Sequence, residues 1–599
     1  MTPPRPLQAF GGVIGLAAGA LASLPGPPTV NARLLEWGVG DRRGDEVRPR
    51  GCREPGLQVS VVGAVENIQQ LIGELAARGH RIEHGDNADV VAHAYEQWGD
   101  ACLERFWGAF ALVIWDRRAD TLLLARDRVG GRCLYYQVAG ELFAFASGLD
   151  TLRALVHVPR DVDLQAVDAY LTFRAVPAPL TIYRSVRKLP AARALHVTRG
   201  AISVRRYWAI PFEKDRIGVD EAAERLSQLL REVSGRITAD RSWGVLLSGG
   251  LDSSLLVGLL SEGADRPVRT FTFAFPRKPE EPTSAARVAR RFATDHRVFA
   301  VQPRVADKLG EIVACYEEPY ADVAAVSLHC GLSLLRGTVA VALTGDGGDE
   351  LFCGRERHVV YGTIGRLGIP EWTLAAVGRL PVPHRRARLL LSGLAAPMVD
   401  RHLLWLSGLP PAEKAGLYAP QFAAAIDLDY GRTLLDPLIP AAAHPVDQML
   451  AVDVGLWVPE VLSVKLRAGS TAGDVDVRAP FLTHRFVEFA AGLPPALKIG
   501  FMRSKAVLRR LARMRRIPAA MPLMRGTATK VSVPDLLRGE LRPMLEEMVL
   551  GPEALSRSYF RPAAIRQLVD AHIAGRADHS RYLWPLLMLE QWHRLQPGR

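Results

Sequence analysis

An apolar segment that runs into two glycines, an aspartate and two serines constrains this chain more than any other feature. The stretch reads LLSGGLDSSLL and spans residues 246–256. The apolar residues before Ser248 predict a strand, and those after Ser254 predict a helix. A helix that begins where a strand has just ended offers unpaired N–H groups and the positive end of its dipole. We therefore expect a strand–turn–helix unit of an open α/β sheet, with a turn that binds phosphate oxygens.

The composition of this turn indicates a nucleotide bound together with a metal ion. The lysine and the G-x-x-x-x-G-K spacing of a Walker A loop are absent. Asp252 takes their place, and a carboxylate among phosphate-binding groups is explained if it binds Mg²⁺, which neutralises the phosphates. The glycines permit a close approach of the backbone. The sequence therefore predicts Mg²⁺ and a phosphate-binding site made of Leu246, Ser248, Gly249, Gly250, Asp252, Ser253 and Ser254.

A second segment of the same kind follows later in the chain. The stretch ALTGDGGDELF, residues 342–352, again runs from an apolar strand pattern into glycines and carboxylates. We expect Gly345 and Asp346 to extend the nucleotide site. Asp349 is the expected second metal ligand, and Glu350 is the expected base that accepts a proton from an incoming amine.

The two loops together resemble the signatures of the asparagine synthetase superfamily. The string S-G-G-x-D-S-S is similar to the pyrophosphate-binding loop of ATP pyrophosphatases, which split ATP between its α and β phosphates. The later segments EEPYADVAAVS (317–327), DVDVRAPFLTHRFVEFAAGLP (474–494) and SKAVLRRLA (504–512) resemble segments of that family. Residues 106–136 resemble the class II glutamine amidotransferase domain that precedes the synthetase in this family.

The resemblance implies two domains, and the hydrophobic patterning agrees with it. Residues 1–207 are expected to form an α+β layered, glutaminase-like domain, because strand patterns and Gly-centred turns dominate there. Residues 218–599 are expected to form an α/β parallel-sheet ATP-pyrophosphatase domain with a helical C-terminal part. Asp220 is expected to cap the first helix of the second domain, which should extend to about Thr238.

Two positions depart from the glutaminase signature. The family's nucleophile is an N-terminal cysteine at the start of a Cys-Gly-Ile string, and FGGVIG (10–15) places Gly11 where that cysteine would be. Val62 precedes Gly63 where the family has the asparagine of its oxyanion hole. We therefore expect that the first domain does not release ammonia from glutamine.

Without that ammonia, the nitrogen nucleophile must arrive with the substrate. Specialised branches of the family use an amine of the substrate itself, one to close a β-lactam ring and another to close the macrolactam of lasso peptides. Asp346 and Glu350 disfavour the β-lactam branch. Arg467, Thr471 and Asp476 replace residues of the segments that accompany aspartate binding. The chain therefore resembles a lasso peptide cyclase, which joins the N-terminal amine of a precursor peptide to an Asp or Glu side chain.

That resemblance implies a mechanism and a set of partners. A substrate carboxylate would attack the α-phosphate of ATP, and a late lysine would stabilise the spreading charge. Lys530 is the expected catalytic lysine, and Lys505 is its rival. The expected partners are the precursor peptide, a leader-peptide-binding protein and a leader protease. Asparagine synthesis from aspartate, or a non-catalytic nucleotide-binding role, are the alternative functions.

Composition limits the remaining functions. The formal net charge is +12, but the basic residues are dispersed and lack interleaved aromatic side chains, which disfavours nucleic acid as a partner. The six cysteines form no C-x-x-C pair, which suits a reducing cytoplasm. The apolar stretch near the N-terminus resembles a weak signal peptide, but we interpret it as a buried strand. No later stretch is long and apolar enough to predict a membrane helix.

Overall fold

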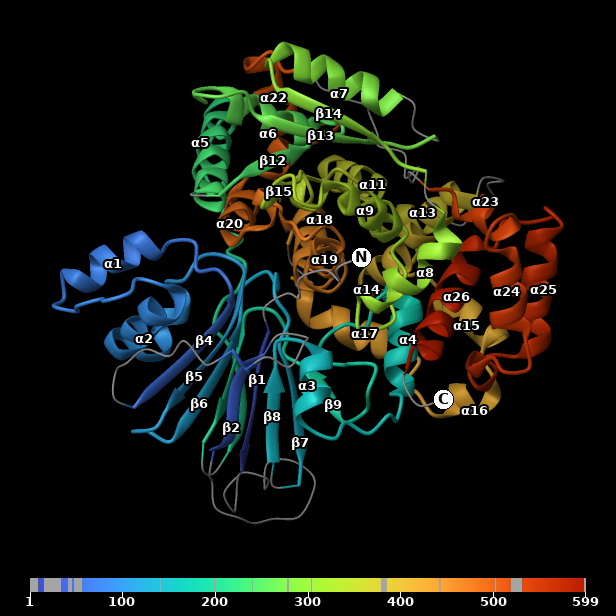
Figure 1. The fold of residues 1–599 in the computed structure, drawn as a ribbon. Coiled ribbons are helices and arrows are strands. Elements are labelled where there is room, and N and C mark those ends of the chain that lie inside the picture. Colours follow the sequence, from blue (N-terminus) through green and yellow to red (C-terminus); the bar gives the residue numbers. More distant parts are fainter. Residues whose placement is uncertain are drawn as a thin grey trace. The chain divides into compact units, whose positions relative to one another are not determined.

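The structure is a computed structural model in which the chain forms two compact units (Figure 1). It describes residues 9–15, 34–40, 46–47, 56–140, 142–198, 201–239, 241–276, 280–302, 304–378, 385–440, 443–500, 503–518 and 531–596. Unit 1 consists of Met1–Asp163 and Pro177–Ile210, and unit 2 of Leu164–Val176 and Pro211–Arg599. The sequence-based division at 207–218 stays a prediction, and it does not anticipate that Leu164–Val176 leaves unit 1.

Unit 1 contains two antiparallel sheets, which Figure 1 shows as neighbouring layers. The first has the strand order β3-β2-β1-β8-β7-β9 and the second the order β11-β10-β6-β5-β4. The strands are β1 (Ala9–Gly15), β2 (Leu34–Gly40), β3 (Glu46–Val47), β4 (Leu57–Gly63), β5 (Phe110–Asp116), β6 (Thr121–Arg126), β7 (Tyr135–Ala139), β8 (Leu142–Ala146), β9 (Val186–Lys188), β10 (Arg193–Val197) and β11 (Ile202–Arg206). The buried strand expected near the N-terminus is β1, which lies between β2 and β8.

The strand β5 explains how these layers are held together. Its side chains alternate between two faces, and both faces are apolar. Val113 packs in the core between the two sheets, together with Phe145 of β8. Leu112 faces the other way and packs in a second core with Leu71 and Val90. These two come from α1 (Ile68–Ala76) and α2 (Asn87–Trp98), so a helical layer covers the outer face of the second sheet. The α+β layered fold expected for this part is confirmed.

Unit 2 begins with a parallel sheet of strand order β14-β13-β12-β15-β16. Its strands are β12 (Trp243–Leu246), β13 (Arg269–Ala274), β14 (Asp295–Ala300), β15 (Val341–Leu343) and β16 (Asp476–Arg478). The connecting helices include α5 (Val219–Thr238), α6 (Leu251–Ser261), α7 (Glu280–Arg291), α8 (Val305–Ala314) and α9 (Ala324–Leu332). The chain runs outward from β12 to β14 and then returns to the other side of β12 as β15. This reversal creates a topological switch point, where open α/β sheets bind their ligands.

Helices dominate the rest of unit 2, as expected. They are α10 (Gly348–Leu351), α11 (Glu356–Leu367), α12 (Glu371–Gly378), α13 (Arg385–Ala395), α14 (Met398–Leu406), α15 (Pro411–Leu417), α16 (Pro420–Ala424), α17 (Tyr430–Leu435), α18 (Pro445–Val452), the π-helix η4 (Asp453–Leu462), α19 (Ser463–Gly473), α20 (His484–Gly492), α21 (Pro495–Lys498), α22 (Ala506–Met514), α23 (Val533–Arg538), α24 (Arg542–Leu550), α25 (Pro562–Ile573) and α26 (Ser580–Arg594). Among the described residues, none of the helices combines the length and the apolar character needed to cross a membrane.

The predicted cap of α5 is wrong by two residues. Gly218 is the N-cap, with an extended backbone at φ −82° and ψ 164°, and Asp220 lies inside the first turn. A carboxylate there still interacts favourably with the helix dipole. Asp220 also accepts a hydrogen bond of 3.0 Å from Nη2 of Arg510 on α22. The acidic residue at the helix start therefore marks the first turn and not the cap.

The segment Leu164–Val176 carries α4 (Leu164–Phe173) into unit 2. Asp168 forms a buried ion pair with Lys414 of α15, with 2.7 Å between Oδ1 and Nζ. The hydroxyl of Tyr418 donates to the same carboxylate at 2.7 Å. Tyr170 donates from its hydroxyl to the carbonyl oxygen of Pro585 in α26, at 2.8 Å. These buried contacts fix α4 against helices that come much later in the chain.

Candidate active site

The two glycine-rich loops lie side by side at the carboxyl end of the parallel sheet of unit 2. β12 and β15 are adjacent parallel strands, with Val245 opposite Leu343. After β12 the chain turns through Gly249, at φ +72°, and begins α6 at the N-cap Gly250. After β15 it turns through Gly347, at φ +95°, and begins α10. Both turns need a left-handed backbone, which glycine adopts without strain.

The hydroxyl groups of the first loop close the turn on itself. The hydroxyl oxygens of Ser248 and Ser253 are 3.0 Å apart. The N–H of Gly250 donates to Oγ of Ser248 at 3.3 Å. The result is a compact turn at the start of α6, whose first N–H groups have no partner within the helix.

Glycines in the second loop allow the two loops to touch. A Cβ atom added at Gly345 would lie 2.8 Å from the backbone nitrogen of Ser253. A Cβ atom added at Gly348 would lie 2.7 Å from Cγ of Asp252. Real Cβ atoms do not approach other heavy atoms so closely, and the obstructing groups are backbone or a buried carboxyl. The second loop therefore requires glycine where it packs against the first.

Two carboxylates from the two loops meet at one lysine. Nζ of Lys505 is 2.7 Å from Oδ1 of Asp349 and also forms an ion pair with Oδ2 of Asp252. Lys505 is 5% exposed and caps α22 in the left-handed conformation, at φ +56°. This backbone conformation is costly for a residue with a side chain. The fold therefore holds the lysine between the carboxylates in spite of local strain.

This cluster has the chemistry of a magnesium site. Mg²⁺ in phosphate-binding sites is held by one or two carboxylates together with the phosphates of the substrate. Asp252 and Asp349 supply two carboxylates, and Lys505 balances only one of their charges. The residues present therefore fit Mg²⁺ bound together with ATP. The metal role predicted for Asp252 and Asp349 stays a prediction.

Asp346, at the tip of the second loop, is held by a buried lysine. Nζ of Lys465, on α19, donates to Oδ1 of Asp346 at 2.8 Å. The hydroxyl of Thr344 donates to the other carboxylate oxygen. Burial alone lowers the pKa of Lys465, but the charges of Asp346 and then Asp322 raise it above its usual value. The lysine therefore stays charged and fixes the loop tip.

Glu350, the predicted base, is buried and paired with an arginine. Nε of Arg355 donates to Oε1 of Glu350 at 3.2 Å, and the guanidinium lies 5.2 Å from the ring centroid of Trp457. Burial lowers the pKa of Arg355, but Glu350, Asp349 and Asp453 together raise it. The arginine is therefore permanently charged. The Glu350 carboxylate orients Arg355 in this structure, and its role as a base stays a prediction.

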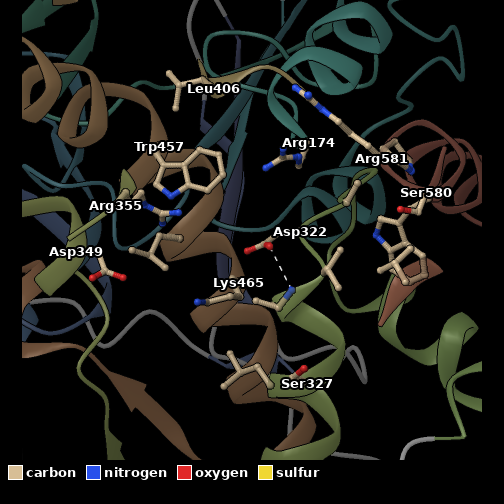
Figure 2. Close-up of a pocket in the computed structure, with 18 of the residues that line it drawn as sticks. Arg174, Asp322, Ser327, Asp349, Arg355, Leu406, Trp457, Lys465, Ser580 and Arg581 are labelled. Atoms are coloured by element: carbon tan, nitrogen blue, oxygen red, sulfur yellow. Dashed lines mark hydrogen bonds between the residues drawn. The ribbon is translucent and has the colours of Figure 1, made fainter. Parts of the chain in front are cut away.

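A large cavity opens beside the two loops. Its volume is about 1760 Å³, and its wall extends from the loops to α15, α25 and α26. Figure 2 shows Arg174, Arg355, Lys465 and Trp457 around it, with Asp322 accepting the N–H of Ala324 at 3.2 Å. Burial, followed by the charge of Arg581, lowers the pKa of Arg174 to about 10, so Arg174 stays charged at neutral pH.

Most of the predicted nucleotide-site residues line this cavity. They are Leu246, Ser248, Gly250, Asp252, Ser253, Gly345 and Asp346, with Asp349 and Glu350 beside them. Gly249 packs instead against α7, where an added Cβ would lie 2.6 Å from the backbone of Ser284. Ser254 is fully buried and is not part of the wall. Lys530 lies outside the described residues.

Sequence reasoning missed several residues of the wall. Arg174 and Lys465 carry no motif that marks them, because they come from segments distant in sequence from the loops, and Arg355 lies just beyond the second loop motif. Lys505 was only the rival of Lys530, although the resemblance of SKAVLRRLA to a family segment was a signal for it. The ion pairs with two loop carboxylates now make Lys505 the better candidate.

The three residues that disfavour aspartate as the substrate do not line the cavity. Arg467, Thr471 and Asp476 are all absent from its wall. Asp476 lies in β16 and pairs with Nη1 of Arg241 at 2.8 Å. These replacements therefore give no evidence about the size or chemistry of the substrate.

Gly11 lies in the middle of a sheet of unit 1. It pairs with Gly38 of β2 and with Ala146 of β8. A Cβ atom there would be 2.4 Å from Cδ1 of Leu155 and 3.2 Å from the carbonyl oxygen of Phe145. The end of the Leu155 side chain therefore occupies the space where the resemblance places the nucleophile. The lack of glutaminase activity stays a prediction, which this geometry supports.

Comparisons with known proteins cover nearly the whole chain. Residues 225–594 match the family model for asparagine synthase, and residues 49–208 match the model for a glutamine amidotransferase domain. Asparagine synthetase (glutamine-hydrolyzing) 1 of Bacillus subtilis (strain 168) is 25% identical over 545 residues, which cover 89% of this chain and 84% of that protein. A putative asparagine synthetase (glutamine-hydrolyzing) of Mycobacterium bovis is 28% identical over 573 residues, or 89% of this chain and 83% of that protein.

Proposed function

Because the chain belongs to the asparagine synthase family and is an amide ligase of that type, we propose that it activates a carboxylate as an acyl adenylate. The carboxylate oxygen attacks the α-phosphorus of ATP, and pyrophosphate leaves. A nitrogen nucleophile then attacks the acyl carbon, AMP leaves, and the amine loses a proton. The observation that carries this proposal is the meeting of Asp252, Asp349 and Lys505 where two glycine-rich loops begin.

The residues of the site divide this work between them. The N–H groups at the start of α6 and the Ser248 hydroxyl bind phosphate oxygens. Members of the family generally use ATP and Mg²⁺, and Asp252 and Asp349 would hold the ion, which neutralises phosphate charge. Lys505 keeps the two carboxylates together. Glu350 is the candidate acceptor for the proton of the amine.

The nitrogen nucleophile must reach this site without glutamine hydrolysis in unit 1. Gly11 has no nucleophilic side chain, and Val62 cannot donate a side-chain hydrogen bond to an oxyanion. Free ammonia or an amine carried by the substrate are the two sources that remain.

Aspartate is the first candidate for the activated acid. The two relatives compared above carry the name asparagine synthetase. Charged arginines in the cavity wall, Arg174 and Arg355, suit the second carboxylate of such a small acid. The product with ammonia would then be asparagine.

A peptide is the second candidate, and the cavity volume favours it. Pockets for small molecules usually measure about 300–1000 Å³, and this cavity measures about 1760 Å³. Its wall includes Trp405, Trp457 and Trp584, which can pack against peptide side chains. In this reading the chain closes a macrolactam between the N-terminal amine and an Asp or Glu side chain, as lasso peptide cyclases do. A leader-peptide-binding protein and a leader protease would then be its partners.

Isotope exchange between pyrophosphate and ATP tests the shared first step. We expect exchange that depends on an acid substrate, with AMP as the final nucleotide product. Asp252→Asn should abolish the exchange, because it removes one of the two carboxylates of the proposed metal site. Asp220→Asn is the matched control, since it removes an exposed carboxylate from the first turn of α5. ADP as the product would overturn the proposal.

The choice of acid separates the two candidates. One reaction contains aspartate and ammonium, and the other contains a leaderless peptide with a free N-terminal amine and an Asp or Glu side chain. Exchange with aspartate and formation of asparagine would establish the first candidate. A peptide that loses one water in mass and resists carboxypeptidase would establish the second. A chain that exchanges with neither acid, although it binds ATP, would be a nucleotide-binding protein without ligase activity.

A further inference from the structure

Two histidines and a glutamate converge in unit 1, far along the chain from the ligase loops. His80 lies in the loop after α1, and His93 and Glu96 lie on the same face of α2. One ligand atom from each residue can be chosen so that all three lie within 4.8 Å of one another. His93 is only 4% exposed, whereas Glu96 lies at the surface.

The hydrogen bonds around these imidazoles determine which nitrogens carry protons. Nε2 of His80 is 2.9 Å from the side-chain oxygen of Gln97, and an amide oxygen can only accept. His80 must therefore be protonated on Nε2. Nε2 of His93 faces the buried carboxylate of Asp89 at 3.7 Å, which favours a proton on that nitrogen too. With protons on both Nε2 atoms, neither Nδ1 is a donor.

This assignment leaves two lone pairs facing each other. Nδ1 of His80 and Nδ1 of His93 are 3.2 Å apart. Two neutral imidazoles with protons on their outer nitrogens cannot form a hydrogen bond across that distance, because neither Nδ1 is a donor. A cation placed between them removes the repulsion.

The separation of the two nitrogens matches a zinc ion. Tetrahedral Zn²⁺ binds histidine nitrogens at about 2.0–2.1 Å, which places two such nitrogens about 3.3 Å apart. Oε2 of Glu96 is 3.9 Å from Nδ1 of His93 and can complete a third ligand position by a small rotation. Its competing partner, Arg118, is exposed and 3.6 Å from the other oxygen, so this pair is weak.

We propose that His80, His93 and Glu96 bind a divalent transition metal, with Zn²⁺ as the ion that their geometry fits. Gln97 accepts from Nε2 of His80, and the Asp89 carboxylate lies 3.7 Å from Nε2 of His93, so we assign both as positioning residues. Metal-binding histidines characteristically donate their other N–H to such groups. Three protein ligands leave one position for water. The ion joins the loop after α1 to α2 and thereby stabilises the helical layer of unit 1.

Zinc titration of the full-length protein tests the proposal. The protein is first treated with a chelator and then titrated calorimetrically with Zn²⁺ in excess Mg²⁺, which occupies the carboxylates of unit 2. We expect one tight site. His80→Ala and Glu96→Gln should weaken binding by more than the roughly 10- to 100-fold that loss of an outer partner costs. Gln97→Leu should weaken Zn²⁺ binding by a factor within that range. His84 is an exposed histidine of the same loop, and the His84→Ala variant should bind Zn²⁺ as the wild type does.

Cobalt provides a second measurement that does not depend on calorimetry. Co²⁺ in a site with histidine ligands should give visible absorption bands in the wild type and in His84→Ala. The bands should be lost in His80→Ala. Binding of unchanged affinity in His80→Ala, or no binding by the wild type, would overturn the proposal. The histidine pair would then share a proton instead of a metal ion.

Discussion

At the scale of single residues, Lys505 is the most informative side chain of the ligase site. It is buried between two carboxylates and held in a left-handed conformation. A lysine in this position can stabilise the site before nucleotide binds, because it balances one of the two negative charges.

Replacement of this lysine should expose the charge it balances. We expect Lys505→Met to lower the free energy of unfolding by about 3–5 kcal/mol, since buried Asp252 and partly buried Asp349 would then lose the cation between them. Mg²⁺ should restore part of the loss. Thermal unfolding with and without Mg²⁺ measures both effects, and Lys308→Met, at an exposed ion pair, is the control. A variant with wild-type stability in the absence of Mg²⁺ would contradict this account of the cluster.

A second residue couples the stability of unit 2 to pH. Burial, and then the charge of Arg357, lower the pKa of His402 to about 3. The unfolded chain takes up a proton on this residue near pH 6.5, while the folded chain stays neutral. Stability therefore falls as the pH falls from about 6.5 toward 3, by about 1.4 kcal/mol for each pH unit.

His402→Phe should remove this part of the pH dependence. Phenylalanine keeps the edge-on ring contacts with Tyr361 and Trp405 and cannot bind a proton. Unfolding midpoints at pH 7.5 and pH 5 should differ less in the variant than in the wild type. Equal differences in the two proteins would show that His402 is not responsible.

At the scale of elements, the two loops were predictable because their signals are local. Gly249 and Gly347 occupy turns that only glycine adopts easily, and each turn follows a short apolar strand. The cap of α5 was assigned wrongly because Asp and Gly both occur at N-caps and the sequence does not show which one is extended. Arg174 and Lys465 were not predictable, since their place in the wall depends on how distant segments pack.

The contact between the two loops gives a prediction about glycine. Gly348→Ala should abolish pyrophosphate exchange, because its Cβ would lie 2.7 Å from the Asp252 carboxyl. Gly235 lies at an exposed position of α5, and a Cβ added there would have no atom within 4 Å. Gly235→Ala should therefore raise the free energy of unfolding by about 0.5–1 kcal/mol. Exchange rates and unfolding curves of the two variants provide the comparison. Full exchange activity in Gly348→Ala would mean that the loops do not pack as described.

At the scale of the whole molecule, unit 1 matches a glutamine amidotransferase domain but carries Gly11 and Val62 at two positions of the resembled signature. We expect no glutamate when the purified protein is incubated with glutamine. Gly11→Cys should not restore the activity, because Val62 still cannot donate a side-chain hydrogen bond to an oxyanion. Glutamate release measured by a coupled dehydrogenase assay checks both statements. Release by the Gly11→Cys variant alone would show that only the nucleophile is missing.

The path of α4 has a consequence for the history of the gene. A deletion of the coding region for unit 1 would also remove Asp168, the partner of buried Lys414, and Arg174 from the cavity wall. A continuous deletion across unit 1 would therefore damage the ligase as well. Selection for the ligase alone would be enough to keep this part of the gene, because the reading frame of one unit runs through the other.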